Sequence, residues 1–525
     1  MARGMKKRAA GRRSNAALWL AVAPRILLVV VMVASQLTLC WLFLRFLSRD
    51  AVPLYAGLEL LSGLAVVALL NNHQNPSYRY AWVLIVLLLG VFGLALYLLW
   101  GRGSRYNAFG RRLQRAAARR ADEALPSAAA LQALAAAQPQ GLRVARYLAG
   151  QGFPLYTGSQ LHYWGEGAPA FEAMLADMEG AQAFIYMEFF IVFEGALFER
   201  FLDVMARKAA QGVTVCLLYD DIGSLLTTNR AFLERLRAAG IQVRVFNPVQ
   251  RYTSQLYLNY RDHRKILAVD GHVAYTGGIN IADEYANLYA KLGGHWKDSA
   301  LRVAGPAAHS LTLFFTQMWQ AMAGDDAEAP LPVPPPASGM DGPGFAQPYE
   351  DGPHNNPNNP AENVYRQMIA AAQHTLYITT PYLVVDDIML DALCVAAQCG
   401  VDVRILLPSV PDHWYVHLTS QSFYGELLRA GVRVYEYTPG FIHSKLMVCD
   451  GAMAAVGSVN MDYRSFHLHY ECAVWVAGGD MPGAVQEDIE AALAVSGEIS
   501  LAAWQRRPWY KKMAQPVLRL FAPLM

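Results

Sequence analysis

The sequence is poor in charge, in cysteine and in carboxylate clusters. Charged residues make up 16% of the 525 positions and the formal net charge is only +2, so no general attraction to nucleic acid is indicated. The six cysteines show no C-x2-C pair and no regular spacing, which argues against a zinc ribbon or a disulfide framework and favours small buried apolar side chains. We therefore expect no metal, no cofactor and no nucleic-acid partner.

Apolar residues are abundant instead, at 54% of the chain, and three long runs of them lie near the N-terminus. Residues 26–44, 51–70 and 81–100 are each long enough to cross a bilayer, and Glu59 is their only charged residue. The first run is too long for the apolar part of a signal peptide. Residues 1–101 are therefore predicted to form a membrane anchor with two or three transmembrane helices. Core helices of a soluble domain are the alternative.

Two basic regions lie outside these runs. Seven arginines between positions 102 and 120, spaced among alanines, predict a basic juxtamembrane helical region over residues 102–152. Residues 501–525 combine tryptophans and basic side chains with later apolar ones, which predicts an amphipathic tail at a membrane interface. The alternatives are a solvated helix face for the first region and a helix packed on the core for the second.

The remaining chain shows one order of strands and helices twice, which predicts an α/β fold of mixed sheets flanked by helices. Strands are expected at 184–190, 213–219, 243–246 and 263–269, with helices at 196–210 and 231–239. The second copy has strands at 375–379, 401–407, 432–437 and 443–448, with helices at 388–398 and 423–430. We expect two similar domains, 153–323 and 361–500, joined by a Pro/Asn/Gly-rich linker at 324–360. They should form a pseudo-dimer with any shared site at the seam.

Each predicted domain ends in the same constellation of polar residues. His263 is followed by Lys265, Asp270, Gly277 and Asn280, at intervals of +2, +7, +14 and +17. The same intervals separate the members of the second copy, which are His443, Lys445, Asp450, Gly457 and Asn460. Strand alternation predicts that each histidine and lysine share one face, and Asp-Gly predicts a turn into a second strand. Two matching copies are too specific for coincidence.

These residue types suit metal-free cleavage of a phosphodiester. A neutral imidazole can attack phosphorus near neutral pH, while a second histidine protonates the leaving alcohol and later deprotonates the acceptor. One histidine cannot do both at once, which explains two copies. The lysines and asparagines would supply fixed donors to the phosphoryl oxygens.

The motif resembles that of the phospholipase D superfamily, which is H-x-K-x4-D followed by G-[GS]-x-N. Further segments resemble bacterial cardiolipin synthases within it, namely 75–82, 259–265, 276–281, 380–382 and 440–443. Leu383 departs from the aromatic residue common in that family. The resemblance implies that one phosphatidylglycerol forms a phosphohistidine, releases glycerol and is then attacked by a second phosphatidylglycerol. A phospholipase D hydrolase, or a transferase using another alcohol, is the alternative. A non-catalytic scaffold is disfavoured by the two intact motifs.

The resemblance also assigns roles to individual residues. It implies that His263 is the nucleophile and His443 the acid/base, although the two motifs by themselves leave that order open. Asp270 and Asp450 would orient a histidine or organise its surroundings. Lys265, Lys445, Asn280, Asn460, Gly278 and Ser458 would bind the substrate phosphate.

Three further residues are candidates for support of the site. Glu188 is expected at a strand end, either pointing at the site or held in a salt bridge. Glu471 matches an acidic position that follows the second motif in the family. His413, with His417, could contact a headgroup or simply lie on the surface.

The positive charges make a prediction about topology. The tail at residues 3–13 and the arginines at 102–120 should both stay in the cytoplasm, which requires an even number of crossings. The run at 51–70 contains Pro53, Gly57, Glu59 and Gly63, so a re-entrant path is expected there. We therefore predict a multi-pass protein of the bacterial inner membrane with its catalytic domain on the cytoplasmic face. Three full spans and an outward-facing domain are the alternative.

Overall fold

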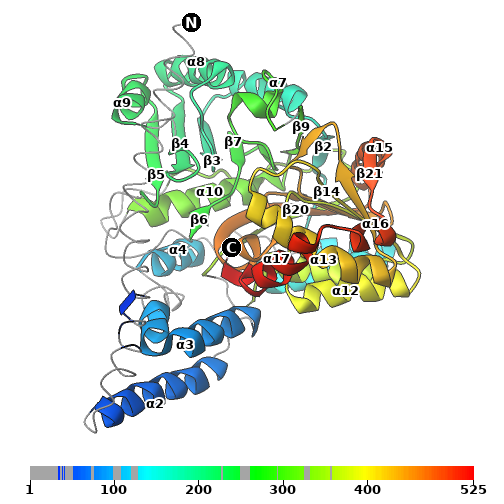
Figure 1. Cartoon of the computed structure of the whole chain (residues 1–525). Coiled ribbons are helices and arrows are strands. Elements are labelled where there is room, and N and C mark those ends of the chain that lie inside the picture. Colours follow the sequence, from blue (N-terminus) through cyan, green and yellow to red (C-terminus); the bar gives the residue numbers. More distant parts are fainter. Residues whose placement is uncertain are drawn as a thin grey trace, which may run out of the picture. The chain divides into compact units, whose positions relative to one another are not determined.

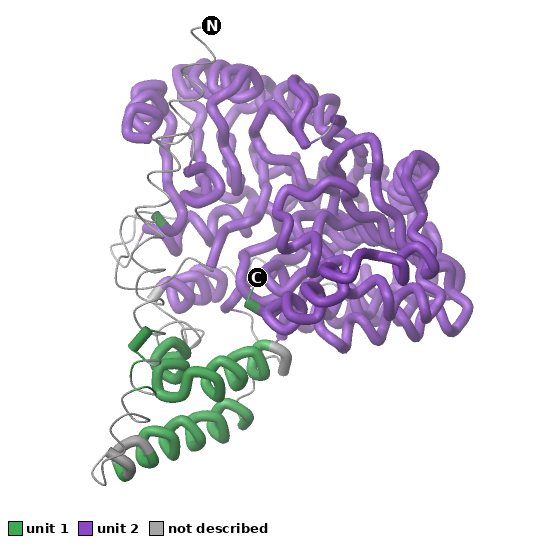
Figure 2. Tube along the Cα trace, in the orientation of Figure 1, with its two compact units in different colours: residues 1–107, 248–259, 524 green, residues 108–247, 260–523, 525 purple. Residues whose placement is uncertain are grey.

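A computed structural model describes residues 51–71, 76–98, 108–119, 128–225, 229–248, 260–292, 294–323, 331–354 and 358–524, and four isolated positions before residue 51. The chain divides into two compact units, coloured separately in Figure 2. The smaller unit comprises residues 1–107, 248–259 and 524, and the larger unit comprises residues 108–247, 260–523 and 525. Each unit is described by itself.

The smaller unit contains two apolar helices that pack against each other, α2 (Ala51–Leu70) and α3 (Pro76–Leu96). Among the described residues, only the Tyr78–Leu96 part of α3 is long and apolar enough to span a membrane, and the apolar part of α2, Ala56–Leu70, is shorter. The predicted run at 26–44 lies almost entirely outside the described residues. One candidate span is therefore found, and the number of crossings stays a prediction.

The larger unit is built from two sheets with the same internal strand order (Figure 1). The first runs β2 (Gln160–Trp164), β10 (Ala300–Ala304), β8 (Val273–Gly277), β7 (Ile266–Val269), β3 (Phe184–Phe189), β4 (Thr214–Asp220) and β5 (Gln242–Phe246). The second contains β1 (Tyr156–Thr157), β11 (Phe345–Asp351), β20 (His469–Ala477), β18 (Met453–Gly457), β17 (Leu446–Cys449), β12 (Thr375–Thr379), β14 (Asp402–Pro408), β15 (Arg433–Tyr437) and β21 (Ser496–Glu498). The order β10-β8-β7-β3-β4-β5 corresponds to β20-β18-β17-β12-β14-β15, so the predicted duplication is confirmed.

Three strands in each half run parallel, and their neighbours run antiparallel. The inner parallel strands of the first sheet, β3 and β4, are almost completely buried and therefore read as nearly continuous apolar runs, whereas β5 at the edge is only partly buried. In β3, Tyr186 contributes to a core shared by both halves, whereas its neighbour Met187 contributes to an outer core. This alternation is the period of two expected for a strand.

Helices fill the space between and outside the sheets. The shared core includes α10 (Ala308–Ala323) and α15 (Met481–Ala494) together with strands of both sheets. The outer core of the first half includes α7 (Gly167–Glu179), α8 (Ala196–Ala210) and α9 (Arg230–Ala238). The outer core of the second half includes α11 (Pro360–Ala371), α12 (Asp387–Gln398) and α13 (Trp414–Ala430). Because one core contains residues of both halves, the halves form one folding unit.

Several predicted boundaries are wrong. The expected linker at 324–360 contains β11, an interior strand that pairs with β1 and β20. Pro348 and the surrounding Pro- and Gly-rich residues hid this strand from the sequence pattern. The region 102–152 is helical, as predicted, and contains α4 (Ala108–Arg119), α5 (Ala128–Ala137) and α6 (Leu142–Gly150), whose Leu113, Leu134 and Leu148 are buried in the larger unit. Its position next to a membrane stays a prediction. Helix α13 begins nine residues before its predicted start at 423.

The tail packs on the larger unit, as the second of the two alternatives expected, and its contact with a membrane stays a prediction. Helices α16 (Leu501–Gln505) and α17 (Trp509–Leu520) pack on α13, where the Trp504 indole N–H donates to the Gln421 carbonyl. The other face of α17 exposes Trp509, Met513 and Val517. Of the five cysteines in the described residues, Cys216, Cys449 and Cys472 are buried, as expected, whereas Cys394 is half-buried and Cys399 is exposed.

Candidate active site

Two short strands cross the seam and bring the two motifs together. Strand β6 (Arg261–Asp262) ends next to His263 and pairs with β20 of the second half. Strand β16 (Gly440–Ile442) ends next to His443 and pairs with β9 (His295–Lys297) of the first half. Each histidine is fixed by its backbone N–H as well: His263 donates to the Tyr470 carbonyl at 2.9 Å, and His443 donates to the Lys297 carbonyl at 2.7 Å. Each half therefore places its histidine on a strand of the other half.

The crossing gives each histidine a carboxylate from the opposite half. Nδ1 of His263 lies 2.9 Å from Oε1 of Glu471, and Nδ1 of His443 lies 2.7 Å from Oδ2 of Asp298. A carboxylate partner makes Nδ1 the protonated nitrogen and leaves the Nε2 lone pair available. Both pairs are buried. The arrangement suits one imidazole for attack and the other for proton transfer.

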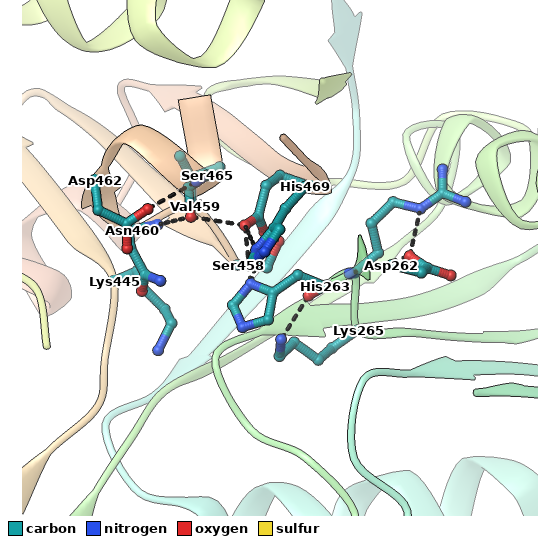
Figure 3. A network of polar contacts seen from close by, with 12 residues as sticks. Asp262, His263, Lys265, Lys445, Ser458, Val459, Asn460, Asp462, Ser465 and His469 are labelled. Atoms are coloured by element: carbon teal, nitrogen blue, oxygen red, sulfur yellow. Dashed lines mark hydrogen bonds and ion pairs between the residues drawn. The ribbon is translucent and has the colours of Figure 1, made fainter. Parts of the chain in front are cut away.

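The lysines lie beside the histidines, and Figure 3 shows Lys265 and Lys445 approaching His263 from opposite sides. Lys265 donates to the carbonyl of His263 at 2.5 Å, and Nζ of Lys445 lies 2.9 Å from Nδ1 of His443. All four side chains are almost fully buried. The predicted reason for each His–Lys pairing is wrong, however, because these residues lie between strands rather than in one.

Burial lowers the pKa of each of these basic groups. Burial lowers the pKa of Lys265 to about 8 and that of Lys445 to about 7. Burial, followed by the nearby lysine charges, lowers the pKa of His263 well below its ordinary value and that of His443 to about 4. Burial raises the pKa of Glu471 to about 7. A buried cluster of basic groups that penalises several cations at once favours a bound anion such as a phosphodiester.

The asparagines and small residues of the motifs are buried at the same seam. Asn280 accepts from the N–H of Ile191 and donates to the Tyr285 hydroxyl, and the Tyr285 ring lies 5.6 Å from that of His443. Oδ1 of Asn460 is buried and has no hydrogen-bond partner among the described residues. Asn280 thus has a structural role on the His443 side, whereas Asn460 retains an acceptor atom for a ligand.

Gly278 and Ser458 contact the carboxylates of the site. A Cβ at Gly278 would lie 2.0 Å from Oδ1 of Asp298, so only glycine fits there. Ser458 donates its hydroxyl to Glu471, and Ser465 does so at 2.7 Å. Both positions support the acids, and their predicted contact with substrate stays a prediction.

The expectation that Asp270 and Asp450 orient the histidines is wrong. The Asp270 carboxylate accepts the backbone N–H groups of residues 182–184 at 2.7–2.8 Å, and Asp450 accepts those of residues 373–375 at 2.8–2.9 Å. Both aspartates have positive φ and precede a glycine of positive φ, as the predicted turns require. They fix the start of the neighbouring strand, β3 or β12, and the histidines are oriented by other acids.

Of the three support candidates, only Glu471 touches a motif histidine. Glu188 binds the fully buried Arg264 at 2.6 Å, which confirms the salt-bridge alternative. Arg264 also binds Glu350 of the second half. His413 is exposed at the N-terminus of α13, where Nδ1 lies 3.0 Å from Asp412.

Two residues of the site were missed from the sequence. Asp298 is the first-half equivalent of Glu471: the N–H of Gly278 donates to the carbonyl of Ser299, and that of Ser458 donates to the carbonyl of Cys472. His469 is the second, and its ring lies 5.6 Å from that of His263. The available signal was an acid near the start of the strand that follows each G-[GS]-x-N, before β10 in the first half and within β20 in the second, but its distance from the motif differs between the halves.

Comparisons with known proteins agree with this geometry. A family model described as cardiolipin synthase, PLD-like domain, matches residues 174–319 and 365–493, and a phospholipase D-nuclease N-terminal model matches residues 60–102. The chain is 36% identical over 470 residues to a cardiolipin synthase of Geobacillus kaustophilus, covering 88% of this chain and 91% of that one. It is 34% identical to cardiolipin synthase 2 of Bacillus anthracis, with 88% and 89% covered.

A solved structure shares the fold. Phosphatidylserine synthase of Haemophilus influenzae superposes with a TM-score of 0.54 at 14% identity, covering 73% of this chain and 98% of that one. At this identity the likeness concerns the fold alone. The duplicated sheets, the paired motifs and the extent of the matches lead to one assignment: the chain belongs to the cardiolipin synthase family of phospholipase-D-like phosphatidyltransferases.

Proposed function

We propose that the protein is a cardiolipin synthase that transfers the phosphatidyl group of one phosphatidylglycerol to a hydroxyl of a second. The observation that carries this proposal is the pair of buried histidines, each held by a carboxylate of the opposite half and flanked by a lysine. The family membership supports the choice of lipid. No nucleotide-activated lipid is needed, because one phosphodiester is exchanged for another.

In the first step Nε2 of His263 attacks phosphorus. A nitrogen–phosphorus bond forms, the bond to the glycerol oxygen breaks, and His443 gives its proton to that oxygen. In the second step the terminal hydroxyl of another phosphatidylglycerol attacks phosphorus while His443 takes its proton. The nitrogen–phosphorus bond then breaks and His263 is restored.

His443 needs a proton for the first step, although its pKa in the free site is lowered to about 4 by burial and by Lys445. A bound phosphodiester brings a negative charge next to both lysines and offsets that repulsion. Substrate binding therefore raises the pKa of His443, so that its imidazole carries the proton needed in the first step. Lys265 and Lys445 contribute the fixed donors for the phosphoryl oxygens in both steps.

The test uses the purified full chain in phosphatidylglycerol vesicles without CDP-diacylglycerol. Mass spectrometry should find cardiolipin and free glycerol in equal amounts, and excess glycerol should reverse the reaction. Cardiolipin that appears only when CDP-diacylglycerol is supplied would overturn the proposal. Phosphatidic acid as the only product would assign hydrolase activity instead.

We also propose that the protein is a multi-pass inner-membrane protein with its larger unit on the cytoplasmic face. Support comes from the candidate span in α3, from the basic residues that flank the apolar runs, and from the aromatic and apolar face of α17. Lys511 and Lys512 lie on the same helix and suit an anionic lipid surface. Reporter fusions after Arg120 and after Met525 decide the sidedness, and reporters active only outside the cytoplasm would reverse it.

A further inference from the structure

His469 is a buried histidine at the site for which the mechanism above has no role. It begins β20, and Nδ1 lies 3.8 Å from Oε1 of Glu471, too far for a hydrogen bond. Both ring nitrogens are buried and lack a hydrogen-bond partner among the described residues. Figure 3 shows the ring next to that of His263.

A small movement of Glu471 cannot supply the hydrogen bond that His469 lacks. Its carboxylate already contacts Nδ1 of His263 and accepts hydrogen bonds from the hydroxyls of Ser458 and Ser465. Turning toward His469 would break the contact that orients His263. Leaving a buried polar atom without a hydrogen bond is unfavourable, so two such atoms on one ring require an explanation in a native protein.

The equivalent position in the first half shows that the fold does not require a polar side chain here. Ser299 and Cys472 are equivalent, and three residues before them lie Trp296 and His469. The Trp296 ring lies 5.5 Å from that of His443, as the His469 ring lies 5.6 Å from that of His263. In the first half, the aromatic ring that packs beside the motif histidine therefore belongs to a tryptophan, Trp296. The imidazole of the other half adds two buried polar atoms, and one of them lies within 4.8 Å of the ligand atoms of His263 and Glu471.

The surroundings indicate which ligand those atoms suit. Burial lowers the pKa of His469 well below its ordinary value, and His263, Arg464 and Arg261 add to this effect. A neutral imidazole carries one donor and one acceptor. The ligand atoms of His263, His469 and Glu471 lie within 4.8 Å of one another, which would allow a metal ion. The arginines and lysines around them oppose a cation and favour an anion that also carries hydroxyl groups.

We propose that His469 binds the glycerol-phosphate headgroup of the lipid, giving one hydrogen bond to a phosphoryl oxygen and accepting one from a headgroup hydroxyl. The proposal rests on the proposed function and adds a residue that recognises the headgroup. A lipid alcohol held in this way has an advantage over water as acceptor. His469 therefore contributes to the choice of transfer over hydrolysis.

The experiment compares His469→Phe with His467→Phe in the full chain, reconstituted in phosphatidylglycerol vesicles. His467 is a matched control, because it is a nearby half-buried histidine whose Nδ1 lies 2.8 Å from the Asn359 amide. His469→Phe should raise KM for phosphatidylglycerol about tenfold and shift the cardiolipin-to-phosphatidic-acid ratio about tenfold toward phosphatidic acid. His469→Asn, which keeps a donor and an acceptor, should restore part of both. His467→Phe should leave the product ratio unchanged.

A second measurement covers the case in which His469→Phe does not fold. Hydrolysis of phosphatidylpropanol, which lacks headgroup hydroxyls, is compared with that of phosphatidylglycerol in the wild type and in His469→Leu, which keeps neither the donor nor the acceptor. The wild type should prefer phosphatidylglycerol, and the variant should prefer it less.

Equal KM and product ratio in wild type and folded His469→Phe would overturn the inference, as would equal preference in the second measurement. An effect that appears only with added Zn²⁺ and disappears with EDTA would make His469 a metal ligand instead. A wild type that makes no cardiolipin would count against the proposed function, and hydrolysis of the two lipids would still test His469.

Discussion

In the first half of the larger unit a glycine, Gly278, lies beside the aspartate that reaches His443, whereas in the second half a serine, Ser458, lies beside the glutamate that reaches His263. Asp298 is shorter and is held by the N–H of Ser299 at 2.8 Å, and Glu471 is longer and is held by two serine hydroxyls. The two halves reach the same His–carboxylate contact with different pairs of side chains. The two copies therefore share the histidine–carboxylate contact, although the residues that form and support the carboxylate differ.

The largest effect that tests this comparison comes from the histidines themselves. His263→Ala and His443→Ala should each lower cardiolipin synthesis by about 10³-fold or more, because neither group can take the other's role. His443→Ala should still accumulate a phosphatidyl group on His263, detectable by mass spectrometry of the denatured protein, whereas His263→Ala should not. The opposite pattern would reverse the two roles, and near-normal synthesis by either variant would exclude a two-histidine mechanism.

The acids should give the next largest effect. Glu471→Gln and Asp298→Asn should each lower kcat by about 10- to 100-fold, because each removes the group that sets the tautomer of one imidazole. Circular dichroism and thermal unfolding provide the control for folding. If one acid proves dispensable, the two contacts are equivalent in geometry but not in function.

The pH dependence should distinguish the two acids. Because the pKa of Glu471 is raised to about 7, its carboxyl takes up a proton as the pH falls through 7 and can no longer accept from His263. We expect kcat/KM to fall about tenfold per unit below that pH, and to fall again as Lys445 loses its proton above about pH 7 and Lys265 above about pH 8. Asp298→Asn should keep the acid limb in its residual activity, and Glu471→Gln should lose it. An unchanged acid limb in Glu471→Gln would assign that limb to another group.

The smallest effect on activity should come from the two motif aspartates. Asp270→Ala and Asp450→Ala each leave three backbone N–H groups without their acceptor, which should cost about 1–3 kcal/mol of folding free energy and several degrees in Tm. Activity per folded molecule at 25 °C should stay within about threefold of the wild type. Equal losses in both variants are expected, because the contacts match in the two halves. A variant that is stable yet inactive would return these residues to the catalytic machinery.

The duplicated fold and the paired motifs could be predicted because they depend on local signals. Helix α8 lies at its predicted residues, and the Asp-Gly turns at 270 and 450 have the expected positive φ. Strand β11 could not be predicted, since Pro348 and its Pro- and Gly-rich flanks are typical of a linker. Asp298 was missed for a different reason: its partner His443 lies in the other half, and such a contact leaves no periodic trace in the sequence.

The exchange of strands β6 and β16 also bears on how such a chain can arise. One repeat folded alone would hold its histidine without a carboxylate, because the acid for that histidine is encoded in the other repeat. An ancestor with a single repeat could therefore be active only as two identical subunits that exchanged these strands. Once the two copies were fused, each could diverge in sequence, but neither could be lost. Selection then acts on Asp298 and Glu471 through histidines that lie in the opposite half of the gene.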